Sequence, residues 1–331
     1  MQVAQAQPMR VRMAAGATSG AVAVAGSARF AYATTAPSPP PEVLADPRDL
    51  LERIDRGDYQ LVVLNFDPPV RADPRWGEVF DRLRCPVLLH ATAASEDYLP
   101  LLDERRFVRN LIAKNDDPLE PEELIAGAGK VLSGDLFGLE KYLLWGVSPI
   151  RIDIRDSREK HAYIAEVTDF ARRLGLGERT SSLIETIADE LITNAIYNAP
   201  RDAAGRPKYA LLPRRQSVTL EPHEVGRLDV ACDGQWLAIA QSDPFGSLTQ
   251  ETVVRYLNRC LVSRSPLADA ATSSGAGIGL YRVFQSLSKF IVNIDPGHRT
   301  EVIALIDLRL TMKKFRQAPK SFHLFVAPGP A

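Results

Sequence analysis

Residue types that could do chemistry gather in the second half of the chain, and the first group is a polar column. Glu190, Asn194 and Asn198 recur every four residues, so on a helix they lie on one face. A carboxylate can accept a proton, and an amide oxygen can bind Mg²⁺. Because the column borders the apolar face of a helix expected at residues 181–198, its members should be partly buried and need polar partners. An ordinary amphipathic helix with a polar margin would show the same pattern.

A second group follows a predicted strand. Residues 227–232 and 235–241 read as two strands joined by Asp233-Gly234, a dipeptide typical of tight hairpin turns. The second strand runs into Ser242-Asp243-Pro-Phe-Gly246. A carboxylate at a strand end, followed by proline and glycine, suits a ligand-binding loop, although Asp-Pro turns are also common elsewhere.

The third group is a run of alternating glycines, Gly275, Gly277 and Gly279, directly before Leu280 and a helical pattern. Glycine lets backbone N–H groups approach a phosphate closely, and a helix N-terminus favours anions. The run is neither a dinucleotide-binding fingerprint nor a P-loop, because it lacks the preceding βαβ strand and the Lys-Ser/Thr pair. We therefore predict a phosphate-binding loop, preceded by a mobile lid at residues 262–274.

Taken in order, these groups resemble the motifs of the GHKL (Bergerat-fold) ATPases. The segment beginning at Glu190 resembles the N box, the one beginning at Asp243 the G1 box, and the one beginning at Gly275 the G2 box. The segment from Gly297 to Thr300 resembles the start of the family's closing hairpin. The resemblance implies an ATP-binding domain with ATP and Mg²⁺ as cofactors. One departure is the G1 box, which has a single glycine where the family has two.

The resemblance also implies a role for each matched residue. Glu190 would be the general base, and Asn194 would hold Mg²⁺ through its amide oxygen. Asp243 would accept a hydrogen bond from the adenine amino group, Gly246 would let the backbone pass close to the base, and Thr300 would support the adenine. The remaining cofactor contacts would come from residues near the metal and phosphates, namely Asn198, Gly275, Gly277, Gly279 and Leu280.

The first half of the chain alternates short apolar runs with helical patterns, which is typical of a doubly wound α/β domain. It resembles a response-regulator receiver domain. In that resemblance Asn65 stands at the phosphoacceptor position, Ala91 where the family has Thr or Ser, and Lys114 at the family's lysine. Because an amide cannot form an acyl phosphate, we expect a degenerate receiver that is not phosphorylated. Asp67 is a rival acceptor, but it points into a loop and two prolines follow it. The predicted strands are residues 28–33, 61–64, 86–90 and 107–113, and the predicted helices are 46–56, 76–83 and 121–132.

We therefore expect an α/β receiver-like domain at residues 28–134, followed by an α+β two-layer Bergerat-fold ATPase domain at residues 155–312. Residues 1–27 lack large apolar side chains and are expected to stay flexible. Residues 135–154 form the expected connection, with a helix at 136–145, and residues 313–331 form a tail. Within the ATPase domain we expect helices at residues 158–174 and 181–198, the second with Thr180 or Ser181 as its N-cap.

A charged segment at residues 200–225 interrupts the expected ATPase domain. It reads either as a solvated insertion or as an element that contacts phosphate or a partner. Its basic residues are Arg201, Arg206, Lys208, Arg214 and Arg215.

Composition limits the function classes. The 331 residues carry a formal net charge of −1, so no basic excess favours nucleic acid. The three cysteines are far apart in sequence, which indicates neither a disulfide framework nor a zinc site. No apolar run is long enough for a membrane span, and the N-terminus makes a poor signal peptide, so we expect a cytoplasmic protein without a membrane partner.

The subgroup follows from what the first half lacks. No two-helix unit with a phosphoacceptor histidine is evident, and His161 lies on the expected ATPase domain's own first helix. The resemblance is therefore closest to the anti-sigma-factor serine kinases. It implies a Mg-dependent signalling regulator that phosphorylates Ser or Thr on a signalling or sigma-regulatory protein, and that could form a homodimer. The alternatives are a catalytically silent ATP-binding interaction module, an ATPase without a protein substrate, and a histidine-kinase-like signalling protein.

Overall fold

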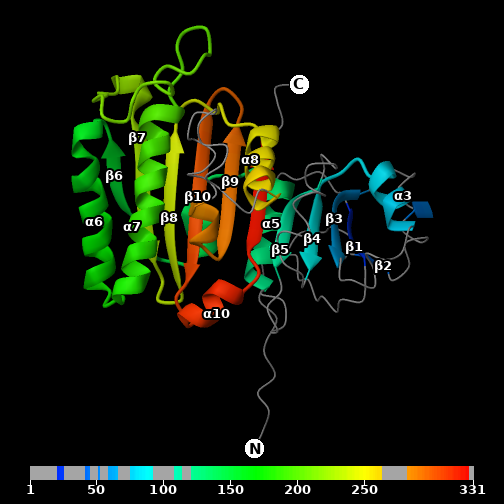
Figure 1. The fold of residues 1–331 in the computed structure, drawn as a ribbon. Helices are drawn as coiled ribbons and strands as arrows, with labels where there is room; N and C mark the ends of the chain where they lie inside the picture. Colours follow the sequence, from blue (N-terminus) through cyan, green and yellow to red (C-terminus); the bar gives the residue numbers. More distant parts are fainter. Residues whose placement is uncertain are drawn as a thin grey trace, which may run out of the picture. The chain divides into compact units, whose positions relative to one another are not determined.

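The structure is a computed structural model. It describes residues 21–25, 42–44, 51–52, 59–65, 75–91, 108–113, 121–262 and 282–327. These residues form a mixed α/β structure made of two compact units (Figure 1), which divide between Asp135 and Leu136. The division falls one residue from the predicted domain end at residue 134.

The first unit is built on a parallel sheet. Its strands are β1 (Ala21–Ala25), β2 (Glu42–Leu44), β3 (Tyr59–Asn65), β4 (Val87–Ala91) and β5 (Val108–Ala113). They lie in the order β2-β1-β3-β4-β5, and each neighbouring pair is parallel. The unit's described helices are α3 (Arg75–Arg82) and α5 (Pro121–Ser133). These elements confirm the strands and helices predicted at residues 61–64, 76–83, 86–90, 107–113 and 121–132 to within about two residues.

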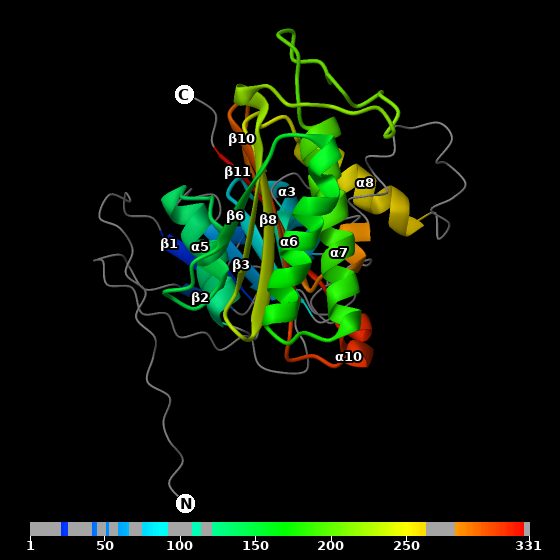
Figure 2. The ribbon, with the colours of Figure 1, turned by 90° about the vertical axis from the view of Figure 1, so that its left-hand side faces the viewer.

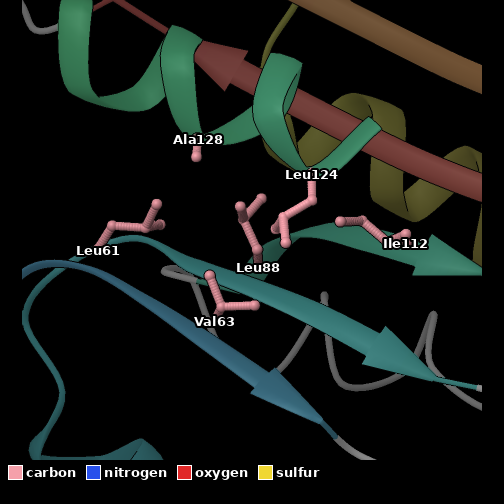
Figure 3. Close-up of a cluster of buried hydrophobic side chains, with 6 residues drawn as sticks. All are labelled: Leu61, Val63, Leu88, Ile112, Leu124 and Ala128. Atoms are coloured by element: carbon pink, nitrogen blue, oxygen red, sulfur yellow. The ribbon is translucent and has the colours of Figure 1, made fainter. Parts of the chain in front are cut away.

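The core of this unit forms where α5 packs against the sheet (Figure 3). Continuous apolar runs in the central strands are buried throughout, as expected for strands of a parallel sheet. The helix contributes its apolar stripe to the same cluster. The cluster comprises Leu61, Val63, Leu88, Ile112, Leu124 and Ala128.

Strand β1 corrects one expectation from the sequence. It lies inside the segment 1–27 that we expected to be flexible, and it pairs with both β2 and β3. Its small side chains give a weak strand pattern, but backbone hydrogen bonding between strands does not depend on side-chain size. The predicted strand at residues 28–33 and most of the predicted helix at 46–56 lie outside the described residues, although Leu51 and Glu52 are helical.

The second unit is built on a mixed sheet. Its strands are β6 (Ile150–Ile154), β7 (Gly226–Cys232), β8 (Trp236–Asp243), β9 (Lys289–Asp295), β10 (Arg299–Asp307) and β11 (Ser321–Val326). They lie in the order β11-β9-β10-β8-β7-β6, where β11 is parallel to β9 and the other neighbours are antiparallel. The predicted hairpin at residues 227–241 is confirmed, with Gly234 at φ 90° in its turn. Within the described ranges, no helix has the length and apolar character needed to cross a membrane.

Three helices lie on one side of this sheet (Figure 2). They are α6 (Lys160–Arg173), α7 (Glu178–Thr193) and α8 (Gln250–Val262). The buried stripe of α7 includes Ile184, Ile187, Ala188, Leu191 and Ile192, which confirms its predicted amphipathic pattern. The helix begins at Glu178 with Gly177 as its N-cap, so the N-cap predicted at Thr180 or Ser181 is wrong.

Two further expectations for the second unit are wrong. The connecting segment has no α-helix at 136–145, but only a 3-10 turn, η2 (Leu139–Tyr142). Gly138 has φ 109° and Gly146 has φ 92°. A right-handed helix cannot continue through either conformation, so no helix can run the length of this segment. The expected tail at 313–331 instead contains α10 (Met312–Gln317) and the buried strand β11. The strand gains its partner β9 from a part of the chain about thirty residues earlier, which a local pattern does not reveal.

Candidate functional site

The predicted polar column lies where α7 changes its winding. After Thr193 the chain continues as a π-turn, η4 (Asn194–Asn198), in which the N–H of Ala199 donates to the carbonyl of Asn194 at 2.9 Å. Such turns are rare and occur frequently at functional sites. The turn packs against β7 and β8. It approaches the sheet closely, because a Cβ added at Gly226 would lie 3.2 Å from that of Ala195.

The two asparagines of the column are joined by a hydrogen bond. The Nδ2 of Asn198 donates to the Oδ1 of Asn194 at 2.7 Å, and both side chains are half-buried. The Oδ1 of Asn198 in turn accepts from the Nη2 of Arg214 at 3.2 Å. Since an amide oxygen has two lone pairs, the Asn194 oxygen keeps room for one further contact. That oxygen fits a single bond to a metal ion.

Glu190 begins the column and forms an ion pair. Its side chain is 15% exposed, and its Oε1 lies 3.2 Å from the Nη1 of Arg282, which is 64% exposed. Arg282 follows Gly279 by three residues, so the pair ties the chain after the glycine motif to the start of the column. Arg282 is not among the residues predicted from the sequence, where its one signal is its place three residues after Gly279.

Asp243 is the last residue of β8 and is 7% exposed. Burial raises the pKa of its carboxyl group to about 6, opposed by a hydrogen bond from the backbone N–H of Phe245. That bond is 3.1 Å long and shapes the loop that follows. Thr300 lies opposite Asp243 on β10, and its buried Oγ1 is close enough to the Asp243 carboxylate to stabilise the charged form, although the pair does not meet strict hydrogen-bond geometry. A buried acceptor therefore lies beside a buried hydroxyl, and such a pair suits the polar edge of a ligand.

Gly246 has a structural reason to be glycine. Its φ is +55°, and a Cβ there would collide with the carbonyl oxygen of Asp295 in the β9–β10 turn. The carbonyl of Gly246 also accepts from the N–H of Gly297 at 3.2 Å. This contact seats the loop after β8 on the hairpin and accounts for the glycine without any ligand. The contact with adenine that the resemblance implies for Gly246 stays a prediction.

The charged segment 200–225 is attached to the site rather than merely solvated. Arg201 donates through Nη1 to the backbone carbonyl of Asn198 at 2.6 Å. Burial lowers the pKa of its guanidinium, and the nearby carboxylate of Asp243 opposes this shift. The guanidinium of Arg214 lies 4.4 Å from the centre of the Tyr197 ring. In contrast, Arg206 pairs with Asp202 within the segment and is exposed.

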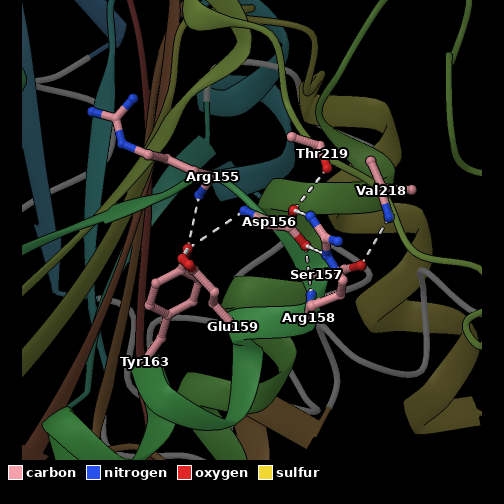
Figure 4. Close-up of polar contacts among 8 residues, drawn as sticks. All are labelled: Arg155, Asp156, Ser157, Arg158, Glu159, Tyr163, Val218 and Thr219. Carbon is pink, nitrogen blue, oxygen red and sulfur yellow. Dashed lines mark hydrogen bonds and ion pairs between the residues drawn. The ribbon is translucent and has the colours of Figure 1, made fainter.

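The end of this segment is anchored on the start of α6 (Figure 4). The carboxylate of Asp156 accepts from the Oγ1 of Thr219 at 2.7 Å and from the guanidinium of Arg158 at 2.6 Å. These bonds hold the pKa of Asp156 well below its usual range. Next to it, the N–H of Val218 donates to the Oγ of Ser157 at 2.8 Å. The segment is therefore fixed at both of its ends.

The structure brings five of the predicted site residues onto adjoining elements. Glu190, Asn194 and Asn198 lie on α7 and η4, while Asp243 and Thr300 lie on the paired strands β8 and β10. The other predicted contacts, Gly275, Gly277, Gly279 and Leu280, lie outside the described residues, as do Asp67 and Lys114.

No cluster of three or more His, Cys, Asp or Glu side chains that could hold a metal occurs among the residues with described positions. Compared with known proteins, the chain matches no protein-family model and shows no significant similarity to a curated protein.

Proposed function

We propose that the second unit binds ATP together with Mg²⁺, and that the protein is a signalling regulator which phosphorylates Ser or Thr on a protein partner. One observation carries the proposal. The buried carboxylate of Asp243 and the buried hydroxyl of Thr300 lie together at a strand end, and the strand packs against the π-turn that begins at Asn194.

The base would bind at Asp243. A carboxylate with a pKa of about 6 is mostly ionised at neutral pH, so it can accept a hydrogen bond from an exocyclic amino group. Burial removes competing water and strengthens that bond. Thr300 would use its Oγ1 toward the same edge of the base, directly or through water. A guanine would present a carbonyl at the corresponding position, which a carboxylate repels.

The phosphates would bind at the column. Mg²⁺ is usually held by one or two protein groups together with substrate phosphates, rather than by a protein cage. Asn194 has one acceptor position left for such a contact, and the described residues contain no carboxylate cluster that could replace the phosphates. The metal would therefore arrive with the nucleotide.

For transfer, Glu190 would accept the proton of a partner's hydroxyl group. The hydroxyl oxygen would form a bond to the γ-phosphorus while the bond from that phosphorus to the β–γ bridging oxygen breaks and ADP leaves. Before this step, Glu190 must break its ion pair with Arg282 and form a hydrogen bond with the partner's hydroxyl group. An ion pair with so exposed an arginine is worth at most about 1 kcal/mol, so the exchange is easy.

The first unit would dock or regulate. Its strand order β2-β1-β3-β4-β5 is that of flavodoxin-like doubly wound sheets, which supports the receiver-like interpretation. Asn65 and Ala91 end the neighbouring parallel strands β3 and β4, so they lie at the same edge of the sheet. This is the edge at which doubly wound sheets bind ligands. With an amide in place of the carboxylate, the unit would not accept a phosphoryl group.

A catalytically silent ATP-binding module is the second candidate. The ion pair between Glu190 and Arg282 favours it, because one of the two carboxylate oxygens, Oε1, is already engaged.

The test is calorimetry with ATP and Mg²⁺, followed by incubation with labelled ATP and candidate partner proteins. We expect Glu190→Gln to keep ATP binding and abolish transfer, and Asp243→Asn to weaken ATP binding. If folded wild-type protein binds no nucleotide at millimolar ATP, the proposal is wrong. If it binds ATP but never transfers phosphate, the silent module is correct.

A further inference from the structure

The segment 200–225 brings an arginine to the polar column from outside the four motifs. We propose that Arg214 binds the phosphate chain of the nucleotide, so that this segment gives the site its preference for ATP over nucleotides with fewer phosphates. The inference rests on the proposed ATP-binding function and assigns to it a residue that the motifs do not include.

Arg214 faces the groups that would surround the phosphates. Its Nη2 donates to the Oδ1 of Asn198 at 3.2 Å, and Asn198 donates to the proposed metal ligand Asn194 at 2.7 Å. Its charge also interacts with the carboxylate of Glu190. The guanidinium therefore lies at the Asn198 end of the column, near enough to Glu190 for their charges to interact, and so beside the place that the proposal gives to the phosphates of a bound nucleotide.

The guanidinium has donors to spare. Arg214 forms one side-chain hydrogen bond within the described residues, whereas a guanidinium carries five N–H donors. Its carboxylate neighbour Glu190 is engaged by Arg282. Phosphate oxygens accept two parallel bonds from such a fork, and these charge-assisted bonds are stronger than a bond to a neutral amide.

The position of Arg214 is fixed in advance by one tyrosine. The ring centre of Tyr197 lies 4.4 Å from the guanidinium, and its single O–H is shared between the backbone carbonyls of Arg214 at 3.3 Å and Gln216 at 3.0 Å. Tyr197 is buried in the π-turn that contains Asn194 and Asn198. The arginine and the amides are therefore held by the same element, which lowers the entropy cost of ordering a long side chain on a ligand.

The rest of the segment supports this placement. Lys208 pairs with the fully buried Glu224 at 2.8 Å and with Glu221 at 2.7 Å, and Asp156 holds Thr219 (Figure 4). Arg201 is used differently, since it donates to the carbonyl at the end of the π-turn and lies beside Asp243. Arg214 is thus the segment's basic side chain with both the position and the donors for a phosphate.

The experiment measures the affinity of the full-length protein for ATP, ADP and adenosine in the presence of Mg²⁺, by calorimetry. The variants are Arg214→Ala and Arg214→Lys, with Arg215→Ala as the matched control, because Arg215 is the next residue, has the same charge and is likewise exposed. We expect Arg214→Ala to weaken ATP affinity about tenfold, with a smaller loss for ADP and none for adenosine. Arg214→Lys should lie between wild type and Arg214→Ala, because it keeps the charge and loses the fork. Arg215→Ala should change ATP affinity by less than about twofold.

Three outcomes would overturn the inference. If Arg214→Ala and Arg215→Ala have equal effects, Arg214 makes no specific contact, while ATP binding itself stands. If Arg214→Ala weakens ATP and adenosine equally, the residue maintains the site's structure and does not contact phosphate. If wild type binds no nucleotide, the proposed function fails and the inference fails with it. If Arg214→Ala unfolds, as the loss of a cooperative thermal transition would show, the comparison is made with Arg214→Lys, which keeps a cation in the segment. ATP affinity equal to that of wild type in Arg214→Lys would then contradict the inference.

Discussion

At the scale of single residues, burial brings the pKa of Asp243 close to neutral pH, so both protonation states of its carboxyl group are accessible. Its carboxyl group is 7% exposed, and burial raises its pKa to about 6 because removal from water outweighs the hydrogen bond from Phe245 and the nearby charge of Arg201. A group whose pKa is raised in the folded state binds its proton more readily there than in the unfolded chain. Its ionisation therefore weakens the fold while creating the acceptor that the proposed contact with adenine requires.

The first prediction is a pH dependence of nucleotide binding. ATP affinity should be constant above pH 7 and fall as the pH drops through about 6, approaching a tenfold loss per pH unit, because the protonated carboxyl group no longer accepts the base's amino proton. Calorimetry from pH 5 to 8 measures this. Asp243→Asn should bind weakly, with no inflection near pH 6. An inflection that survives in that variant would show that another group controls the affinity.

The second prediction concerns the stability of the same variant without ligand. Between the unfolded value near 3.8 and the folded value near 6, rising pH should lower the free energy of unfolding, because the folded state holds the proton longer. Asp243→Asn removes this loss and should stabilise the fold at pH 8 by roughly 1–3 kcal/mol. Urea unfolding of both proteins at pH 4 and pH 8 measures the difference in free energy of unfolding between Asp243→Asn and wild type, which should be larger at pH 8. A variant that is less stable than wild type at pH 8 would contradict the assignment.

At the scale of elements, the close contact between η4 and the sheet sets the geometry of the site. Gly226 allows the π-turn to approach β7, since an added Cβ would lie 3.2 Å from Ala195 Cβ and 3.4 Å from the carbonyl oxygen of Ser242. These two neighbours belong to the elements that carry Asn194 and Asp243. Any shift at Gly226 therefore changes the distance between the proposed phosphate contact at Asn194 and the proposed base contact at Asp243.

The third prediction follows from this contact. Gly226→Ala should destabilise the protein by about 1–2 kcal/mol through overpacking, and it should also weaken ATP affinity. Gly129→Ala in α5 is the matched control, because nothing lies within 4 Å of its added Cβ and alanine favours helices. The control should be neutral or slightly stabilising, with ATP affinity unchanged. Equal effects of both variants on affinity would rule out a special role for Gly226.

The fourth prediction tests the anchor of the charged segment. Asp156→Asn replaces the carboxylate that holds Arg158 and Thr219, so the amide of Val218 should exchange its hydrogen faster. Asp169→Asn, in an exposed pair with Arg172, should leave that exchange rate unchanged. Hydrogen exchange measured by mass spectrometry on both variants gives the comparison. Unchanged exchange at Val218 in Asp156→Asn would show that the anchor lies elsewhere.

Elements with strong local signals could be predicted from the sequence. The amphipathic pattern of α7, the Asp233-Gly234 turn and the strand end at Asp243 all depend on neighbours in the chain. The missed features depend on distant partners. Strand β11 can be identified only from its pairing with β9, and the role of Arg282 depends on its ion pair with Glu190, which is 92 residues earlier in the chain. The turn η2 replaced an expected helix because apolar spacing does not report the positive φ of Gly138.

At the scale of the whole molecule, the distribution of acidic groups predicts how metal and nucleotide cooperate. The residues whose positions are described contain no group of three or more acidic, His or Cys side chains suited to a metal. The proposed Mg²⁺ contact at Asn194 is a single neutral amide. Protein groups alone would therefore bind the ion weakly, and most of its ligands would come from phosphate and water.

The fifth prediction is that Mg²⁺ and ATP stabilise the full chain only together. Mg²⁺ alone should leave the unfolding temperature unchanged, whereas ATP with Mg²⁺ at about 100 times the dissociation constant should add about 2.7 kcal/mol, or several degrees. A thermal scan with each component and with both measures this. Stabilisation by millimolar Mg²⁺ alone would reveal a metal site independent of nucleotide.

The π-turn has a consequence for how the chain tolerates insertions and deletions. A π-turn holds one residue more than the α-helical turn it replaces. Deleting one residue between Asn194 and Asn198 would let this stretch close as an ordinary α-helical turn, so the residues after it would keep roughly their present places. Within the turn, Asn194 and Asn198 would be three residues apart instead of four, and the side chains between them would be redistributed around the helix. The spacing of the column is therefore a matter of chain length as much as of residue type, and related sequences that share the site should align across this stretch without a gap.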